Sequence, residues 1–198
     1  MALRFLVVDG NDAAGRARQH ERLGRTAGVG YSGVIHHVAP GSETFVLNPA
    51  DEDAALPTAS ELVSRFDAVV LTGSSLHVWE DQPSVRRQIA FARTVFASRL
   101  PFFGSCWGLQ IATAAAGGVV EQNPRGREVG VARHILLNDA GMRHPMLASR
   151  PRTFDAPCIH LDAVTRPAPG TIILADNAMS DVQAAEIHHA GGVFWGVQ

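Results

Sequence analysis

A cysteine stands between two glycines where an apolar run gives way to a helical pattern. The stretch Gly104-Ser105-Cys106-Trp107-Gly108 joins a predicted strand, Pro101–Gly104, to a predicted helix, Trp107–Ala116. In that context a G-x-nucleophile-x-G pattern is typical of a reactive side chain held on a sharp turn. Because the turn brings its two glycines close together, neither position has room for a Cβ atom. We therefore predict that Cys106 is a nucleophile.

The position of Cys106 at the start of a helix favours thiolate chemistry. The positive end of the helix should lower the thiol pKa from its usual value of about 8.5. The backbone N–H of Trp107 is a candidate donor to a tetrahedral oxyanion, and Gly73, in Leu71–Ser75 at the end of a neighbouring strand, is the candidate second donor. The alternative is a buried structural cysteine, and for Cys158, which lacks such surroundings, we expect burial.

The first half of the chain alternates short apolar runs with helical patterns. This rhythm predicts β/α crossovers, hence an α/β fold with a mostly parallel, open, flavodoxin-like sheet flanked by helices on both faces. The predicted strands are Leu3–Asp9, Thr44–Leu47, Phe66–Leu71 and Pro101–Gly104, and the predicted helices are Asn11–Thr26 (closing near Gly28), a segment ending at Ser60–Arg65, Gln82–Ser98 and Trp107–Ala116.

After Gly117 the pattern changes to strands and turns with hardly any helix, which predicts an antiparallel β extension in the C-terminal half. The expected strands are Val129–Leu137, Thr153–Ile159, Thr171–Ala175, Val182–Ile187 and Val193–Val197, with His188–Gly192 as a hairpin loop.

Composition excludes several classes of protein. The chain has 198 residues, 46% of them hydrophobic and 18% charged, which suits one compact domain. A net charge of -2 without a basic stripe argues against nucleic-acid binding. No segment approaches the roughly 18 apolar residues of a membrane span, and the start of the chain is too short in apolar residues for a signal peptide. We expect a cytoplasmic protein with both cysteines reduced.

Several landmarks occur in the order found in one known family. Gly104–Gln110 (GSCWGLQ), Leu71–Ser75 (LTGSS), Asn123–Gly130, Cys158–Asp162 (CIHLD) and Gly192–Gln198 (GVFWGVQ) resemble the class I glutamine amidotransferase domain with its Cys-His-Glu triad, such as that of GMP synthases. The resemblance covers nearly the whole chain.

The resemblance implies a reaction and a set of roles. Cys106 would attack the side-chain amide of glutamine, form a γ-glutamyl thioester and release ammonia, with Gly73 and Trp107 as oxyanion donors. Gln110 and the main chain near His160 and Leu161 would hold the amino-acid end of the substrate. The position of Glu128 implies that it lines the same pocket.

One departure concerns the base. In the family, the strand that matches Phe194–Gln198 runs into an aromatic residue and then His-Pro-Glu, whose histidine is the general base. We expect residues 1–198 to be a single amidotransferase-like domain truncated just before that segment. His160 and His77 are alternative bases, whereas His188 and His189 lie a strand-length away. The other histidines lack metal-ligand spacing, so we expect no metal and no cofactor.

Three functions remain open. The first is a glutamine amidotransferase that delivers ammonia to a synthetase on another chain, since this chain has no P-loop and no room for a second domain. The second is a stand-alone hydrolase or peptidase acting on a γ-glutamyl small molecule through the same thioester. The third is a non-catalytic glutamine-binding module that has lost the base.

Overall fold

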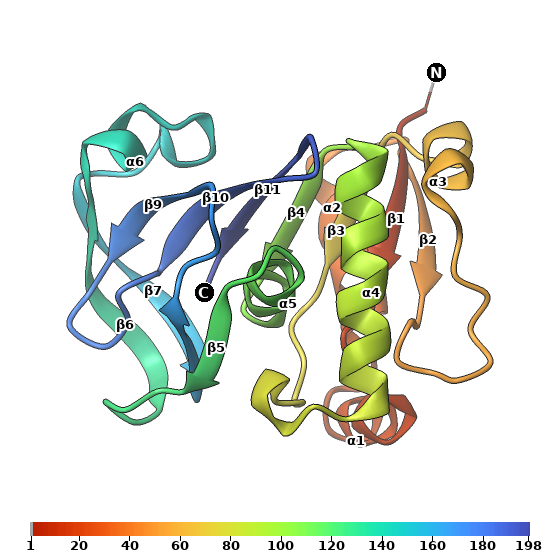
Figure 1. Cartoon of the computed structure of the whole chain (residues 1–198), viewed down its shortest axis with the longest axis horizontal. Helices are drawn as coiled ribbons and strands as arrows, with labels where there is room; N and C mark the ends of the chain where they lie inside the picture. The colour runs from red at the N-terminus through yellow and green to blue at the C-terminus, as the bar shows by residue number, and fades with distance from the viewer. Residues whose placement is uncertain (1) are drawn as a thin grey trace.

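The computed structural model describes residues 2–198 and is organised around one nine-stranded sheet (Figure 1). The strand order is β2-β1-β3-β4-β11-β10-β9-β6-β7, and β5 and β8 form a separate two-stranded sheet. The strands are β1 Arg4–Val8, β2 Glu43–Leu47, β3 Ala68–Leu71, β4 Phe102–Ser105, β5 Val119–Gln122, β6 Glu128–Leu137, β7 Thr153–His160, β8 Asp162–Arg166, β9 Thr171–Asp176, β10 Ala184–His189 and β11 Gly192–Val197.

The large sheet is parallel in one half and antiparallel in the other. All pairings from β2 through β1, β3 and β4 to β11 are parallel, and those from β11 through β10, β9 and β6 to β7 are antiparallel. The predicted α/β fold with an antiparallel extension in the C-terminal half is confirmed.

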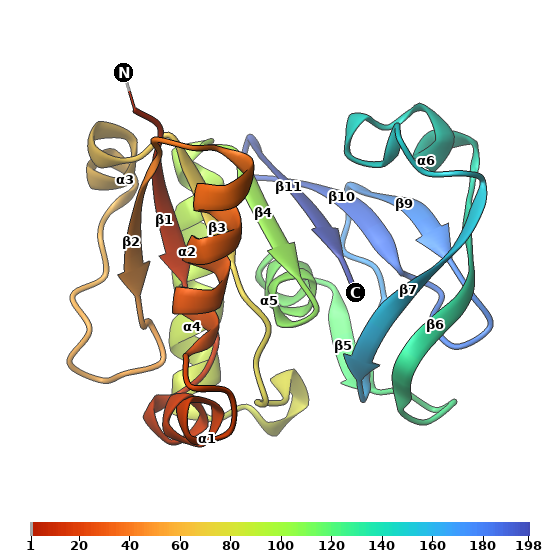
Figure 2. The same ribbon diagram turned by 180° about the vertical axis from the view of Figure 1, so that it is seen from behind.

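Helices cover both faces of the parallel half (Figures 1 and 2). α4 and α5 pack on one face, α2 lies on the other, and α1 sits beyond the lower edge in the view of Figure 1, where the parallel strands end. The helices are α1 Ala13–Leu23, α2 Ala27–Val38, α3 Ala59–Arg65, α4 Pro83–Ser98, α5 Trp107–Ala115 and α6 Asp139–Arg143, with 3-10 turns η1 Val78–Glu80 and η2 Pro145–Leu147.

The main core lies between the sheet and the α4/α5 layer. α4 turns Val85, Ala92 and Phe96 inward at helical spacing, as its sequence predicts. The Phe96 ring packs edge-on against Phe102 of β4, with a centroid distance of 5.5 Å, and Phe102 against Phe194 of β11, at 4.8 Å. Burying each such side chain contributes about 1.5–3 kcal/mol, so these rings hold β4 and β11 against α4.

The helix predicted over Asn11–Thr26 is confirmed as α1, but its predicted end near Gly28 was wrong, and α2, which follows directly, was not predicted. α1 ends at Gly24, which takes the left-handed conformation with φ 69°, and Thr26 then caps α2 by accepting a hydrogen bond from the Val29 N–H. Gly28 is inside α2 rather than a terminator: its N–H donates to Asp9 Oδ2 at 2.8 Å, and a Cβ there would lie 2.7 Å from Val46.

The β5–β8 pair and α6 escaped prediction because they are short and depend on long-range pairing. His160 lies at the end of β7 and not in a loop. The predicted His188–Gly192 loop is shorter than expected, because β10 continues to His189 and turns at Ala190 and Gly191, both with positive φ.

The start of α5 approaches the sheet closely at the β4–α5 junction. A Cβ on Gly104 would lie 2.8 Å from the Cα of Gly108, and a Cβ on Gly108 would lie 2.7 Å from the carbonyl oxygen of Leu71 on β3. The predicted need for two glycines is confirmed. Between them Cys106 has φ 51° and ψ -102°, outside the helical and extended regions.

We expect Gly108→Ala to lower the free energy of unfolding by about 1–3 kcal/mol, because the added methyl group meets backbone that cannot move aside. Gly33→Ala is the matched control: Gly33 lies inside α2 with nothing within 4 Å of its missing Cβ, so alanine should stabilise the protein by about 0.5–1 kcal/mol. Urea unfolding measures both, and a Gly108→Ala protein as stable as Gly33→Ala contradicts the contact.

Candidate active site

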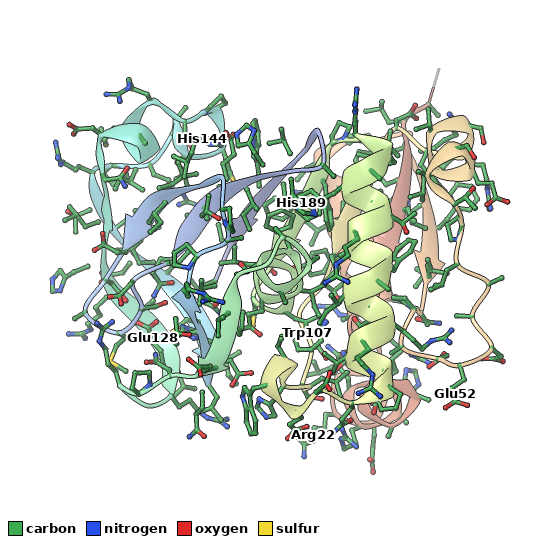
Figure 3. All side chains as sticks on the ribbon, in the orientation of Figure 1. Arg22, Glu52, Trp107, Glu128, His144 and His189 are labelled. Carbon is green, nitrogen blue, oxygen red and sulfur yellow. The ribbon has the colours of Figure 1, made fainter. Side chains whose placement is uncertain are left out.

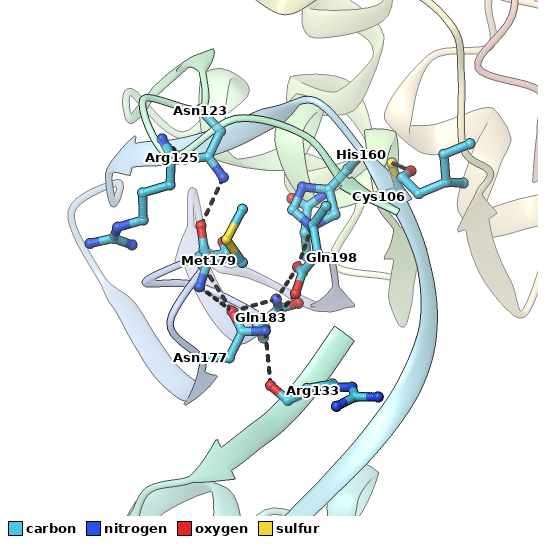
Figure 4. Close-up of polar contacts among 12 residues, drawn as sticks. Cys106, Asn123, Arg125, Arg133, His160, Asn177, Met179, Gln183 and Gln198 are labelled. Carbon is cyan, nitrogen blue, oxygen red and sulfur yellow. Dashed lines mark hydrogen bonds and ion pairs between the residues drawn. The ribbon is translucent and has the colours of Figure 1, made fainter. Parts of the chain in front are cut away.

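The thiol of Cys106 sits between the ends of several strands. Its backbone N–H donates to Val197 O of β11 at 2.7 Å, which ties the turn to that strand. The thiol faces the carbonyl oxygen of Ile159 on β7, with an S···O distance of 3.9 Å (Figure 4). The side chain is half-buried and borders a cavity of about 760 Å³. Cys106 is therefore accessible to a small molecule.

The pKa of Cys106 is raised to about 11, so the predicted lowering of this pKa was wrong. Burial is the largest cause, and the negative charge of Asp162 adds to it. Hydrogen bonds from the Trp107 backbone N–H and the Gln198 side chain act in the opposite direction but are outweighed. The helix start thus points a donor at the sulfur, as expected, but desolvation dominates.

The two predicted oxyanion donors, Trp107 and Gly73, both lie close to the cavity that Cys106 borders. Trp107 directs its backbone N–H to the sulfur, and its indole, which lies in the α4–α5 layer (Figure 3), donates to Gln88 Oε1 at 2.9 Å and fixes the start of α5. Gly73, just after β3, lines the same cavity as Cys106. The arrangement brings both donors to one site.

Asn11, which sequence reasoning did not single out, holds the Gly73 loop. Its Oδ1 accepts from the Ser75 N–H at 3.0 Å and the Ser74 hydroxyl at 3.3 Å, while its Nδ2 donates to Asp9 at 3.4 Å. The signal available in the sequence is an Asp-Gly-Asn triplet directly after an apolar strand. Asn11 thus connects the end of β1 to the end of β3.

Gln110 lies one turn along α5 from Cys106 and is buried. Its Nε2 donates to the carbonyl oxygen of Asp162 at 3.4 Å and to Gln198 Oε1 at 3.5 Å. Gln198 Nε2 is buried and has no oxygen acceptor within residues 2–198. The Gln198 side chain lies near the Cys106 sulfur and lowers the pKa of this thiol. Leu161 accepts from the Asn123 N–H at 2.9 Å, which positions the main chain between β7 and β8.

Glu128 and His160 form a buried pair beside this region (Figure 4). His160 Nε2 lies 2.8 Å from Glu128 Oε2, and its Nδ1 lies 3.0 Å from the carbonyl oxygen of Asp162. Both ring nitrogens of His160 therefore have a hydrogen-bond partner within the described chain. His160 in this arrangement has no nitrogen free to act as a base.

The remaining acceptor capacity of Glu128 is also used. Asn177 donates to its Oε1 at 2.7 Å and Gln183 to its Oε2 at 2.8 Å. Burial opposes ionisation, yet the hydrogen bonds from Asn177, His160 and Gln183 outweigh it and hold the Glu128 pKa below the usual range. Gln110, Glu128, His160 and Leu161 do not line the 760 Å³ cavity, which contains Gly73 and Cys106 from the predicted set.

A second histidine–carboxylate pair lies near the site. His77 Nδ1 is 2.8 Å from Asp162 Oδ2, and Trp79 donates to Asp162 Oδ1 at 3.1 Å. Asp162 is buried, and its charge acts on Cys106. His77 Nε2 makes no hydrogen bond to any described residue, so of the two alternative bases the pairing leaves only His77 with a free nitrogen.

His189 lies in the upper half of Figure 3, against Phe96 at 5.3 Å, away from the strand ends that hold the thiol. Cys158 is half-buried beside the second core cluster rather than buried as expected, because β7 is an edge strand. A more apolar cavity of about 580 Å³, lined by residues such as Phe103 and Trp195, does not contain Cys106.

Among residues 2–198, no helix is both apolar and long enough to traverse a bilayer. No three His, Cys, Asp or Glu side chains of the described chain gather in a way that would hold a metal ion.

Comparison with known proteins gives consistent matches. Residues 37–198 match the family model described as glutamine amidotransferase class-I. The chain is 37% identical over 199 residues to a γ-glutamyl-L-1-hydroxyisopropylamide hydrolase from Pseudomonas sp, which covers 99% of this chain and 66% of the relative. It is 30% identical over 132 residues to a GMP synthase (glutamine-hydrolyzing) from Thermosipho africanus, covering 66% of this chain and 23% of that protein.

Solved structures show the same fold. A glutamine amidotransferase from Thermotoga maritima superposes with a TM-score of 0.72 at 15% identity, covering 100% of this chain and 75% of that one. A glutamine amidotransferase from Methylobacillus flagellatus gives 0.67 at 17% identity, covering 94% and 66%. The chain thus spans 66% or less of the curated relatives named above.

We expect the alkylation rate of Cys106 by iodoacetamide, in a Cys158→Ala background, to rise about tenfold per pH unit up to about pH 10, since the thiolate is the reactive form and the pKa is about 11. Mass spectrometry at a series of pH values measures the rate. A plateau below pH 8 would contradict the raised pKa.

Replacing Glu128 by Gln should lower the free energy of unfolding at pH 7 by about 1–3 kcal/mol, because it removes a buried carboxylate that has hydrogen-bond contacts to His160, Asn177 and Gln183. Glu52→Gln, at an exposed loop position, should have no measurable effect. A carboxyl with a lowered pKa stabilises above its unfolded pKa of about 4.3 and loses that contribution as pH falls through the folded value. The difference between wild type and Glu128→Gln should therefore shrink in acid, and a difference independent of pH would argue against the ionised carboxylate.

Proposed function

We propose, because this chain belongs to the class-I glutamine amidotransferase family, that Cys106 cleaves a γ-glutamyl amide through a covalent thioester. The thiolate adds to the γ-carbonyl carbon, the C–N bond breaks and the amine leaves with a proton. Water then hydrolyses the thioester to glutamate and restores the thiol. The observation that carries this proposal is the accessible Cys106 on a strained strand-to-helix turn with a backbone N–H at its sulfur.

The proposed oxyanion donors are the backbone N–H groups of Trp107 and Gly73. Both border the thiol, and both belong to backbone fixed by its neighbours: Trp107 through Gln88 and Gly73 through the loop that Asn11 holds. Donors that are held in place before the reaction stabilise developing charge without reorganisation. Removing one such donor costs other enzymes about 10²–10³ in kcat.

We propose that the amino-acid end of the substrate lies toward Gln110 and the main chain at His160 and Leu161. Glu128 then acts at one remove, because all the contacts of its carboxylate are to His160, Asn177 and Gln183. It is a positioning residue that keeps the end of β7 against the thiol.

The proposed reaction also requires a general base. A thiol with a pKa of about 11 is almost fully protonated at neutral pH, so attack requires a group that removes its proton and returns it to the leaving amine. The family resemblance implies a histidine just beyond the position of Gln198 for this role.

The substrate proposed first is a γ-glutamyl amide hydrolysed without a partner. Two observations support it: the match of 99% of this chain to a γ-glutamyl amide hydrolase, and a cavity of about 760 Å³ beside the thiol, far more space than ammonia needs. The second candidate is ammonia delivery to a separate synthetase subunit, supported by the similarity to GMP synthases. Both cysteines are free thiols, which suits the reducing cytoplasm that we propose as its location.

Cys106→Ser should reduce hydrolysis of glutamine and γ-glutamyl amides at least about 10³-fold, because the alcohol is a far weaker nucleophile. Cys158→Ala should stay within a few-fold of wild type, since Cys158 lies on the edge strand β7. The readouts are glutamate release, with and without co-purified proteins, and labelling by 6-diazo-5-oxo-norleucine.

Steady turnover of γ-glutamyl amides by the protein alone favours the hydrolase, and turnover of glutamine that rises sharply with a partner favours the second candidate. Equal losses in the two variants, or an adduct on Cys158 and none on Cys106, would overturn the assignment of the nucleophile.

A further inference from the structure

The cavity that borders Cys106 has a one-sided charge. Among its lining residues are Arg18, Arg22 and Arg25, and no aspartate or glutamate side chain of the described chain lines it. The protein as a whole carries a formal charge of -2, so this concentration of positive charge is a local feature. A cavity with this lining attracts anions.

The three arginines come from α1 and the turn after it. Gly15, Arg18, Gln19 and Arg22 recur every three or four residues, which places them on one face of the helix, and that face lines the cavity. Gly15 is the only buried residue of α1. Core packing therefore does not account for the residues on this face.

The arginines have no protein partner. Arg16, also on α1, pairs with Asp51 at 2.6 Å, but Arg18, Arg22 and Arg25 make no ion pair or side-chain hydrogen bond within the described residues. All three side chains are exposed. Three guanidinium groups that border one cavity and have no ion pair with a described residue are available to bind a carboxylate or another planar anion.

Cys106 borders this cavity, whereas Gln110, His160 and Gln198 do not line it. His160 and Gln198 lie on the side of β11 and β7 (Figure 4), and α1 lies beneath β1 and α2 (Figures 1 and 2). A γ-glutamyl amide whose glutamyl part lies toward Gln110 must direct its amine substituent to the other side of the thiol. That side is the arginine-lined cavity.

We propose that this cavity binds an acidic group on the leaving amine, so that the preferred substrates are γ-glutamyl amino acids or γ-glutamyl peptides with a free carboxylate. This inference rests on the proposed function, because it requires the glutamyl part to be bound at Cys106. The arginines act in binding and specificity, and they take no part in the chemical step.

Two ligands that differ in one group test the proposal. γ-Glutamyl-L-alanine carries a carboxylate where γ-glutamyl-L-1-hydroxyisopropylamide carries a hydroxymethyl group. Binding to a Cys106→Ala protein is measured by calorimetry, which requires no turnover. We expect the acidic ligand to bind about 10-fold more tightly at low salt, as a charge-assisted contact predicts, and the preference to fall as salt is added.

The double variant Arg18→Gln/Arg22→Gln should remove the preference for the acidic ligand and leave the affinity for the neutral ligand within about twofold, since glutamine is also a good helix former. Arg166→Gln, at an exposed arginine of β8 outside this cavity, should change neither affinity.

Equal affinity of the Cys106→Ala protein, without arginine substitutions, for the two ligands overturns this inference and leaves the proposed function standing. An equal loss for both ligands in the double variant also overturns it, because the arginines would then bind the glutamyl carboxylate common to both. If the Cys106→Ala protein binds neither ligand, the proposed function fails and this inference fails with it.

Discussion

The close approach of α5 to the sheet is the constraint on which the site depends. Gly104 and Gly108 leave no room for a side chain between β4, α5 and the carbonyl oxygen of Leu71. At the centre of this turn, Cys106 takes a positive φ of 51°. The same turn aims the Trp107 N–H at the sulfur, so a single steric feature sets both the nucleophile and one of its donors.

Electrostatics divide the surroundings of the thiol into two regions. On the side of β7 and β11, the side chains of Glu128 and His160 are buried and hydrogen-bonded to each other and to their neighbours, which fixes their positions. Toward α1, the guanidinium groups of Arg18, Arg22 and Arg25 are exposed and form no ion pair with any described residue. The thiol between them is kept neutral by burial. Fixed geometry on one side and available charge on the other are what a site needs to hold one part of a substrate while selecting the other.

The sequence predicts features that depend on local patterns. The β/α rhythm predicted the α/β sheet, and the glycines around Cys106 predicted its turn, because both are set by residues close together in the chain. The helix α2 was missed, although Gly24 and Thr26 mark the end of α1 and the start of α2.

The sequence could not show how opposing effects combine to set a pKa, or which distant segments come into contact. The raised pKa of Cys106 results from desolvation opposing hydrogen bonds, and no motif gives its sign. The Asp162–His77 pair and the Asn11 contact to the Gly73 loop join segments more than 60 residues apart, as the structure alone reveals.

The most direct measurement is a crystal structure of the protein after reaction with 6-diazo-5-oxo-norleucine. The account predicts an adduct on Cys106 whose ketone oxygen lies about 3 Å from the backbone nitrogens of both Trp107 and Gly73, as an oxyanion site requires. Its amino-acid end should point toward Gln110. An adduct whose oxygen faces solvent or the Ile159 carbonyl, with neither N–H in reach, would contradict the central claim.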